Sequence, residues 1–222
     1  MSNNLNLQHG EESIQQISDH IEKHLGKIEM VFHEIVSDEV HIDVYWVKAS
    51  EKFPFNRLIT SGMSDLPMVT PPGTSQSRYA ELMMTLPADW KFDKESFNNE
   101  AWYWPIRTLK FLARLPHHYE TWLGFGHTVP NGDPAEPYAP NTKLCGAIIL
   151  PSVTAPEDFN RLPIRYGKEI IFYSVVPLFE SEMNFKLRKG VNDLLDLFDK
   201  KRISDIVDIK RVDVTKKFFG FL

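Results

Sequence analysis

The chain has 222 residues and a mass of 25.7 kDa, a length typical of one large domain. Apolar residues make up 42% of it and charged residues 25%, which disfavours disordered, collagen-like and disulfide-rich classes. The net charge of −5 has the wrong sign for a protein that binds the phosphate backbone of nucleic acids. Residues 1–140 carry the acidic excess, with 11 basic and 19 acidic side chains.

The cysteine content and the N-terminal sequence bear on the compartment. Cys145 is the only cysteine, so an internal disulfide cannot form, and a reducing environment fits best. The first ten residues lack the basic and then apolar order of a secretion signal, and no run reaches about 18 consecutive apolar residues. We therefore expect a cytoplasmic protein with no membrane contact.

The first predicted element is an amphipathic helix over residues 11–25. Ile14, Ile17, Ile21 and Leu25 recur at helical spacing there, and Gly26 follows the last of them. Residues 1–10 show no such pattern, and we expect them to be flexible.

A meander of strands is predicted after this helix. Segments 28–36 and 40–48 are rich in β-branched and aromatic residues, with a turn at residues 37–39. The second segment has a more polar face that contains Tyr45. Further strands are predicted at residues 55–61 and 79–86, and the latter alternates cleanly between its two faces. A helix followed by a meander indicates the α+β class.

The second half of the chain alternates long loops with regular elements. Two proline-rich loops are predicted, over residues 67–78 and 126–143. Other predicted elements are a helix that opens at Pro105 and stops at Pro116, buried strands at 144–150 and 169–177, and a last helical stripe at 187–198. The basic and aromatic tail, residues 216–222, is expected to dock on the core. Together these elements predict a single α+β domain over residues 1–222, with a mixed, mainly antiparallel sheet flanked by helices.

Motifs for catalysis, cofactors and metals are incomplete. Gly62-Met63-Ser64-Asp65 lacks the second glycine of a hydrolase elbow, and Cys145 lies in an apolar strand. His20 and His24, four residues apart on the first helix, supply at most half of a metal site. We therefore predict no catalytic residue, no cofactor and no metal.

A family resemblance begins at Thr60-Ser61-Gly62-Met63-Ser64-Asp65-Leu66, followed by the alternating strand 79–86. Trp104-Pro105, Gly126-His127 and the segment 178–183 follow in the same order as in bacterial members of the suppressor of fused (SUFU) domain family. In these features, which span about residues 28–198, the chain resembles that family.

The resemblance implies a binding role without catalysis. The animal member of the family represses Gli transcription factors by gripping a short peptide extended between two lobes. Bacterial members are similar to immunity or antitoxin proteins that accompany secreted polymorphic toxins. For this chain it implies a bacterial immunity protein or antitoxin that occludes a partner toxin or, alternatively, a regulatory adaptor that binds a peptide segment. It implies no particular oligomeric state.

The candidate binding residues lie in or near these motifs and are Ser64, Asp65, Leu66, Tyr79, Glu81, Trp104 and His127. Two interpretations of the Gly62 turn remain open. Gly62 can adopt a positive φ while Ser64 and Asp65 bond nearby backbone amides, which would make them structural; alternatively, the turn presents both side chains to a partner. A less favoured alternative is an enzyme or small-molecule binder that uses Asp65 and His127 as a polar pair.

Overall fold

The computed structural model describes residues 2–34, 40–164 and 167–216, with side chains from Ser13 onward. Its helices are α1 (Ser2–Leu25), α2 (Glu100–His118), α3 (Glu180–Lys189) and α4 (Val191–Lys201). Its strands are β1 (Ile28–Phe32), β2 (Asp43–Val47), β3 (Phe55–Ser61), β4 (Tyr79–Pro87), β5 (Thr128–Pro130), β6 (Gly146–Leu150), β7 (Arg161–Pro163) and β8 (Glu169–Leu178).

These strands form one mixed sheet in the order β1-β2-β3-β4-β8-β6-β5, with β7 paired to β8 outside this path. The β4–β8 pair is parallel, and the other pairs are antiparallel. The predicted α+β class with a mainly antiparallel sheet is therefore confirmed. The predicted turn at residues 37–39 and the tail beyond residue 216 lie outside the described residues.

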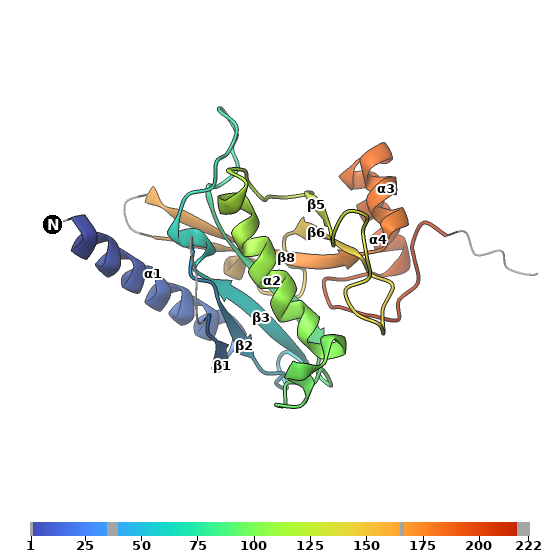
Figure 1. Ribbon diagram of the computed structural model, residues 1–222, viewed down its shortest axis with the longest axis horizontal. Coiled ribbons are helices and arrows are strands. Elements are labelled where there is room, and N and C mark those ends of the chain that lie inside the picture. Colours follow the sequence, from blue (N-terminus) through green and yellow to red (C-terminus); the bar gives the residue numbers. More distant parts are fainter. Residues whose placement is uncertain (1, 35–39, 165–166, 217–222) are drawn as a thin grey trace, which may run out of the picture.

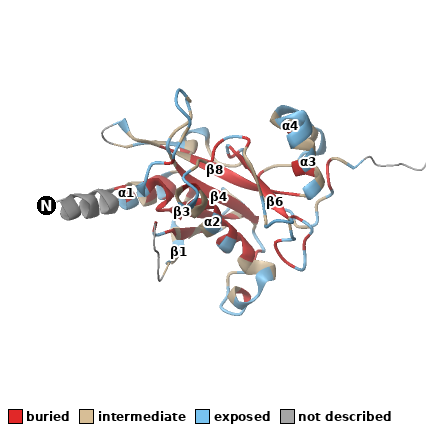
Figure 2. Ribbon diagram, turned by 45° about the horizontal axis from the view of Figure 1, so that its top comes forward, coloured by how far each residue is buried: buried red, intermediate tan, exposed pale blue. Residues whose placement is uncertain are grey.

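Helices cover both faces of the sheet, as Figure 1 shows. On one face α1 packs Ile17 and Ile21 against Tyr45 of β2. On the other face α2 contributes Trp104 and Leu109 to the largest apolar cluster. The face of β2 that the sequence predicted to be more polar is thus buried beneath α1, because Tyr45 presents an apolar ring to that helix. Figure 2 shows burial concentrated in the central strands β4, β6 and β8.

The helix boundaries differ from the sequence prediction. Helix α1 begins at Ser2 rather than at residue 11. Helix α2 begins ahead of Pro105 because the side chain of Asn99 accepts a hydrogen bond from the amide of Ala101 at 2.9 Å. Pro105 removes the amide that would bond the carbonyl of Ala101, and the side chain of Asn141 donates to this carbonyl at 3.4 Å instead.

The predicted last helix is two helices, α3 and α4. They are separated by Gly190, which has a φ of +96°, a conformation that glycine adopts without steric cost. Both helices share a separate apolar cluster with Ile148 and Leu150 of β6, in which Met183, Leu194 and Phe198 are buried.

The segment after α4 returns to the sheet and is fixed by buried polar contacts. The carboxylate of Asp205 accepts hydrogen bonds from the hydroxyls of Ser152 at 2.6 Å and Ser174 at 2.8 Å. Farther along, the guanidinium of Arg211 forms a bidentate ion pair with Glu182, with N–O distances of 2.5 and 2.6 Å. The Glu182 side chain is 0% exposed and that of Arg211 6%, so this pair is shielded from water.

The ion pair makes a prediction about stability. Replacing Glu182 by alanine leaves the Arg211 guanidinium buried without its counter-charge, so Glu182→Ala should lower the free energy of unfolding by about 3 to 5 kcal/mol. Urea denaturation measures this loss. Arg161→Ala breaks the exposed Arg161–Glu169 pair and serves as the control, with an expected loss of about 1 kcal/mol or less. Equal losses of unfolding free energy in the two variants would contradict the conclusion that the Arg211–Glu182 pair holds this segment on the sheet.

Candidate protein-binding site

The turn after β3 depends on Gly62. This residue has a φ of +119°, as the first interpretation of the turn predicted, and a side-chain carbon at this position would collide with the carbonyl oxygen of His41. Gly62 leads into a single 3-10 turn, Met63–Asp65, in which Met63 and Ser64 are buried. The backbone geometry therefore requires glycine at this point.

A buried carboxylate ties this turn to the sheet. Glu81 of β4 is 0% exposed and accepts hydrogen bonds from the Thr60 hydroxyl at 2.6 Å and from the Gly62 amide at 3.1 Å. It also accepts from the Ser64 amide at 3.0 Å and from the Ser64 hydroxyl at 2.7 Å. Burial raises the pKa of Glu81, while these donors act in the opposite direction. The Ser64 hydroxyl thus bonds a carboxylate, whereas the first interpretation of the turn predicted a bond to a backbone amide, and Ser64 and Glu81 form an internal network.

The outer end of the turn is accessible. Asp65 and Leu66 are exposed, with Leu66 at 47%. Partial desolvation of the carboxyl group raises the pKa of Asp65, and the nearby charge of Lys168 acts against this shift. The ammonium group of Lys168 lies 4.7 Å from the ring centroid of Tyr79, close enough for a cation–π contact. The turn therefore carries two exposed residues beside a charged and aromatic strand end.

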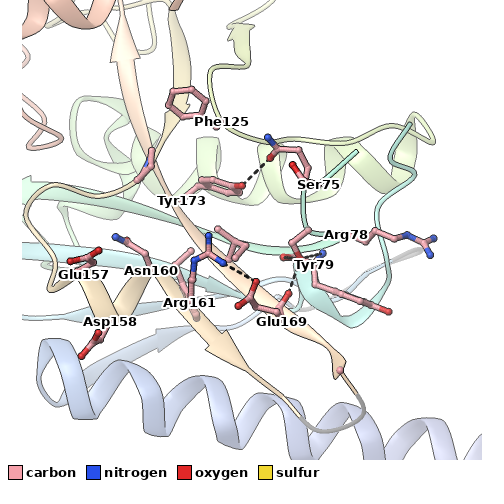
Figure 3. A pocket seen from close by; sticks show the side chains of 16 residues that line it. Ser75, Arg78, Tyr79, Phe125, Glu157, Asp158, Asn160, Arg161, Glu169 and Tyr173 are labelled. Carbon is pink, nitrogen blue, oxygen red and sulfur yellow. Dashed lines mark hydrogen bonds and ion pairs between the residues drawn. The ribbon is translucent and has the colours of Figure 1, made fainter. Parts of the chain in front are cut away.

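An open groove of about 1000 Å³ lies next to this strand end (Figure 3). Its floor is formed by Glu169, Ile171 and Tyr173, alternate residues of β8 that share one face of the sheet. Residues 75–79 form one wall. The remaining lining residues come from β7, from the 3-10 helix Glu157–Asn160 before it, from β8 and from other segments: Phe125, Pro151, Glu157, Asp158, Asn160, Arg161, Gly167 and Phe172.

Polar contacts hold the groove in shape. The hydroxyl of Tyr173 donates to the side-chain oxygen of Gln76 at 3.3 Å, which connects the floor to one wall. Arg161 donates to the carboxylate of Glu169 at 3.2 Å. The hydroxyl of Ser77 donates to the backbone carbonyl of Glu169 at 2.7 Å. The result is a floor with one apolar, one aromatic and one acidic residue, between walls that carry charges of both signs.

Five of the seven candidate residues come together around the start of β4, and two lie elsewhere. Tyr79 lines the groove, Asp65 and Leu66 lie on the exposed side of the turn, and Ser64 and Glu81 are buried beneath it. Trp104 is 0% exposed in the core and stacks on Tyr138 with 4.8 Å between ring centroids. His127 packs on Trp122 with 4.1 Å between ring centroids, and burial lowers its pKa.

Asp65 and His127 do not share a common set of neighbours. The charges that act on Asp65 belong to Lys168 and His41, whereas the charge that acts on His127 belongs to Lys186. Neither residue lines the groove. The enzyme alternative required the two side chains to lie within hydrogen-bond reach in a deep pocket, and the groove over β8 contains neither of them.

Sequence reasoning missed the groove residues Phe125, Arg161 and Tyr173, and it did not single out Gln76 within the predicted loop 67–78. The segment 169–177 was interpreted as a strand buried on both faces. The alternation of Glu169 and Tyr173 with Ile170 and Phe172 at its start is the signal that could have indicated a half-open face. The walls carry no comparable signal, because Gln76 and Tyr173 are 97 residues apart along the chain.

The histidines considered as metal ligands have a packing role. The ring nitrogen Nε2 of His20 lies 2.9 Å from the carbonyl oxygen of Phe159, and its ring stacks on Phe159 and Phe172. In the part of the chain that the structure describes, no three histidine, cysteine or acidic side chains gather as a metal site. Among the same residues no helix is long and apolar enough to span a bilayer.

A mixed sheet with helices on both faces, and a glycine-led turn bonded to a buried carboxylate, make this chain an α+β domain. The chain belongs to the suppressor of fused protein (SUFU) family, whose model matches residues 38–212. None of the curated proteins matches the sequence.

Solved structures share this fold at low sequence identity. A protein described as a SUFU homolog from Neisseria gonorrhoeae is 19% identical with a TM-score of 0.67, covering 93% of this chain and 98% of its own. The structure described as the Sufu–Fu complex is 14% identical with a TM-score of 0.63, covering 91% and 92%. Drosophila Suppressor of Fused is 13% identical with a TM-score of 0.60; the match covers 90% of this chain and 50% of the Drosophila chain.

The Glu81 network makes a prediction about pH. A carboxyl group whose pKa is raised on folding stabilises the fold fully below its ordinary pKa of 4.5, and loses this contribution as the pH rises through the folded-state value. Glutamine does not titrate and places an amide near Thr60. Glu81→Gln should therefore be less stable than wild type by about 1 to 3 kcal/mol in acid, with the difference shrinking as the pH rises.

Urea denaturation across this pH range measures the difference. Ser64→Ala provides a comparison, because it removes one donor but keeps the carboxyl group. The hydrogen bond from the Ser64 hydroxyl lowers the pKa of Glu81. Its loss should therefore raise this pKa further, so that Glu81 titrates at a higher pH in Ser64→Ala. A stability difference between wild type and Glu81→Gln that stays constant or widens with pH would show that the Glu81 pKa is not raised.

Proposed function

We propose that this chain is a non-catalytic protein-binding domain that receives a segment of its partner in the groove over β8. The observation that carries this proposal is the open groove over β8, where the partly exposed Ile171 and the edge of the mostly buried Tyr173 lie between charged walls. An apolar side chain of the partner can bury against such a floor, while polar groups at the rim fix its register. Asp65, Leu66 and Tyr79 extend this surface at one end.

The proposed partner is a polymorphic toxin, and the proposed role is that of a bacterial immunity protein or antitoxin. Occlusion of a toxin needs a rigid surface and no turnover. The acidic excess of residues 1–140 supports this role, because it would accelerate the encounter with a basic toxin. We propose a cytoplasmic setting, in keeping with the single cysteine, Cys145, which is buried and whose pKa burial raises.

A second candidate function is that of a regulatory adaptor that binds a peptide segment. The observation in its favour is the likeness to the structure described as the Sufu–Fu complex, in which a protein of this fold is bound to a protein partner. The same groove would serve both roles, so the identity of the partner distinguishes them.

The groove makes a prediction about binding. The double variant Phe125→Ala/Arg161→Glu removes an apolar wall residue, 40% exposed, and reverses a rim charge. Affinity purification from the native host with wild-type protein should recover a protein partner, and the double variant should weaken its binding by about tenfold or more. Calorimetry with the purified partner measures the affinity.

The matched control is Leu187→Ala/Lys189→Glu on α3, which makes the same kinds of change at exposed positions away from the groove. This control should bind as wild type does. Co-expression of the recovered partner in a heterologous host then separates the roles: a toxin arrests growth unless this chain is present, whereas an adaptor's partner does not. Recovery of a metabolite alone, or equal loss of binding in both double variants, would refute the proposal.

A further inference from the structure

The outward face of α2 is a second surface with unusual exposure of aromatic side chains. Phe111 is 53% exposed and Tyr119, which follows the helix, is 64% exposed. A groove of about 440 Å³ lies on one side of Phe111, between Tyr103 and Tyr119. A second groove of about 350 Å³ lies on its other side, against the loop that contains Pro130. Arg107 and Phe111 line both, so Phe111 forms a ridge between two hollows.

Cationic side chains follow this ridge. Arg107, Lys110 and Arg114 are separated by three and four residues, which places them in one stripe along the helix. All three line the larger groove, and no acidic residue of the described chain does so. The surface therefore combines positive charge with aromatic area, on a chain whose net charge is −5.

Existing contacts hold these cations in place. Arg107 donates to Glu100 at 2.9 Å and to the carbonyl of Tyr138 at 3.1 Å. Lys110 donates to the carbonyl of His33 at 3.3 Å, and Arg114 forms an ion pair with Glu34. Glu100 and Glu34 lie outside the lining of the groove, whereas all three cations line it.

We propose that this face of α2 docks an acidic segment of a partner protein, in which carboxylates flank an apolar side chain. The apolar side chain would pack beside Phe111, and the carboxylates would pair with Arg107, Lys110 and Arg114. Charge complementarity favours this occupant, since the acidic and basic residues that line the groove are all basic; carboxylates of the partner would share Arg107 and Arg114 with Glu100 and Glu34.

A second copy of this chain fits the surface less well. In a two-fold dimer the same patch lies on both subunits, so the cationic stripe would face another cationic stripe. The inference is independent of the groove over β8, which is built from other residues.

The test uses a library of random peptides of about 12 residues displayed on phage and selected on the purified full-length protein. We expect a class of peptides with aspartate or glutamate on both sides of an apolar residue. Phe111→Ala, and separately Arg107→Gln/Lys110→Gln, should weaken the binding of this class by about tenfold, measured by fluorescence anisotropy. Raising the salt concentration should weaken it as well.

Controls assign the effect to this face. Leu187→Ala removes an exposed apolar residue, and Lys189→Gln/Lys200→Gln makes the same change of charge on α3 and α4; both should bind as wild type does. Phe125→Ala/Arg161→Glu should also retain this class, even if the groove over β8 has no ligand. Selected peptides without acidic residues, acidic peptides that bind Phe111→Ala equally, or a dimer in sedimentation that Phe111→Ala abolishes would each overturn the proposal.

Discussion

One buried carboxylate organises the centre of this molecule. Glu81 accepts four hydrogen bonds from Thr60, Gly62 and Ser64, and it fixes the turn after β3 to the beginning of β4. Without these donors its burial would be costly, and without the carboxylate the amides of Gly62 and Ser64 would lose their partner. Tyr79 lies two residues before Glu81 on β4. The hydrogen bonds of Glu81 therefore also position the wall of the groove that Tyr79 helps to form.

The sheet has a face that its helices do not fully cover, and this creates the groove. Helix α2 packs over β2, β3 and β4, whereas Glu169, Ile171 and Tyr173 at the start of β8 line open space. Helix α2 also turns its outer side to solvent, where Phe111 and its neighbouring cations lie. The two surfaces differ in chemistry: the groove over β8 has charges of both signs, and the face of α2 is lined by cations and aromatic rings.

Sequence patterns predicted the elements whose signals are local. The strand β3 has the predicted bounds and β4 extends one residue beyond them, because alternation and flanking turn residues define both. The start of α2 was missed because Asn99 begins the helix ahead of Pro105, which the pattern favoured as a first-turn residue. Gly190 was a visible signal for a break, but the apolar stripe around it suggested continuity.

The candidate site was predictable only in part. The need for a positive φ at Gly62 follows from its residue type and neighbours, whereas the burial of Glu81 depends on donors about 20 residues away in the chain. Alternation placed Glu81 and Tyr79 on the same face of β4. It could not show that this face is buried at Glu81 and lines the open groove at Tyr79. The groove depends on the pairing of β7 and β4 with β8, which no local pattern specifies.

The last described segment has a bearing on how the protein is made. Asp205 bonds to Ser152 and Ser174, and Arg211 completes the surroundings of Glu182, so strands and helices synthesised earlier lack these partners until the segment emerges. These contacts can form only after residues 205–211 have been synthesised. During synthesis, the charge of Glu182 therefore has no counter-charge from Arg211 until residue 211 has left the ribosome.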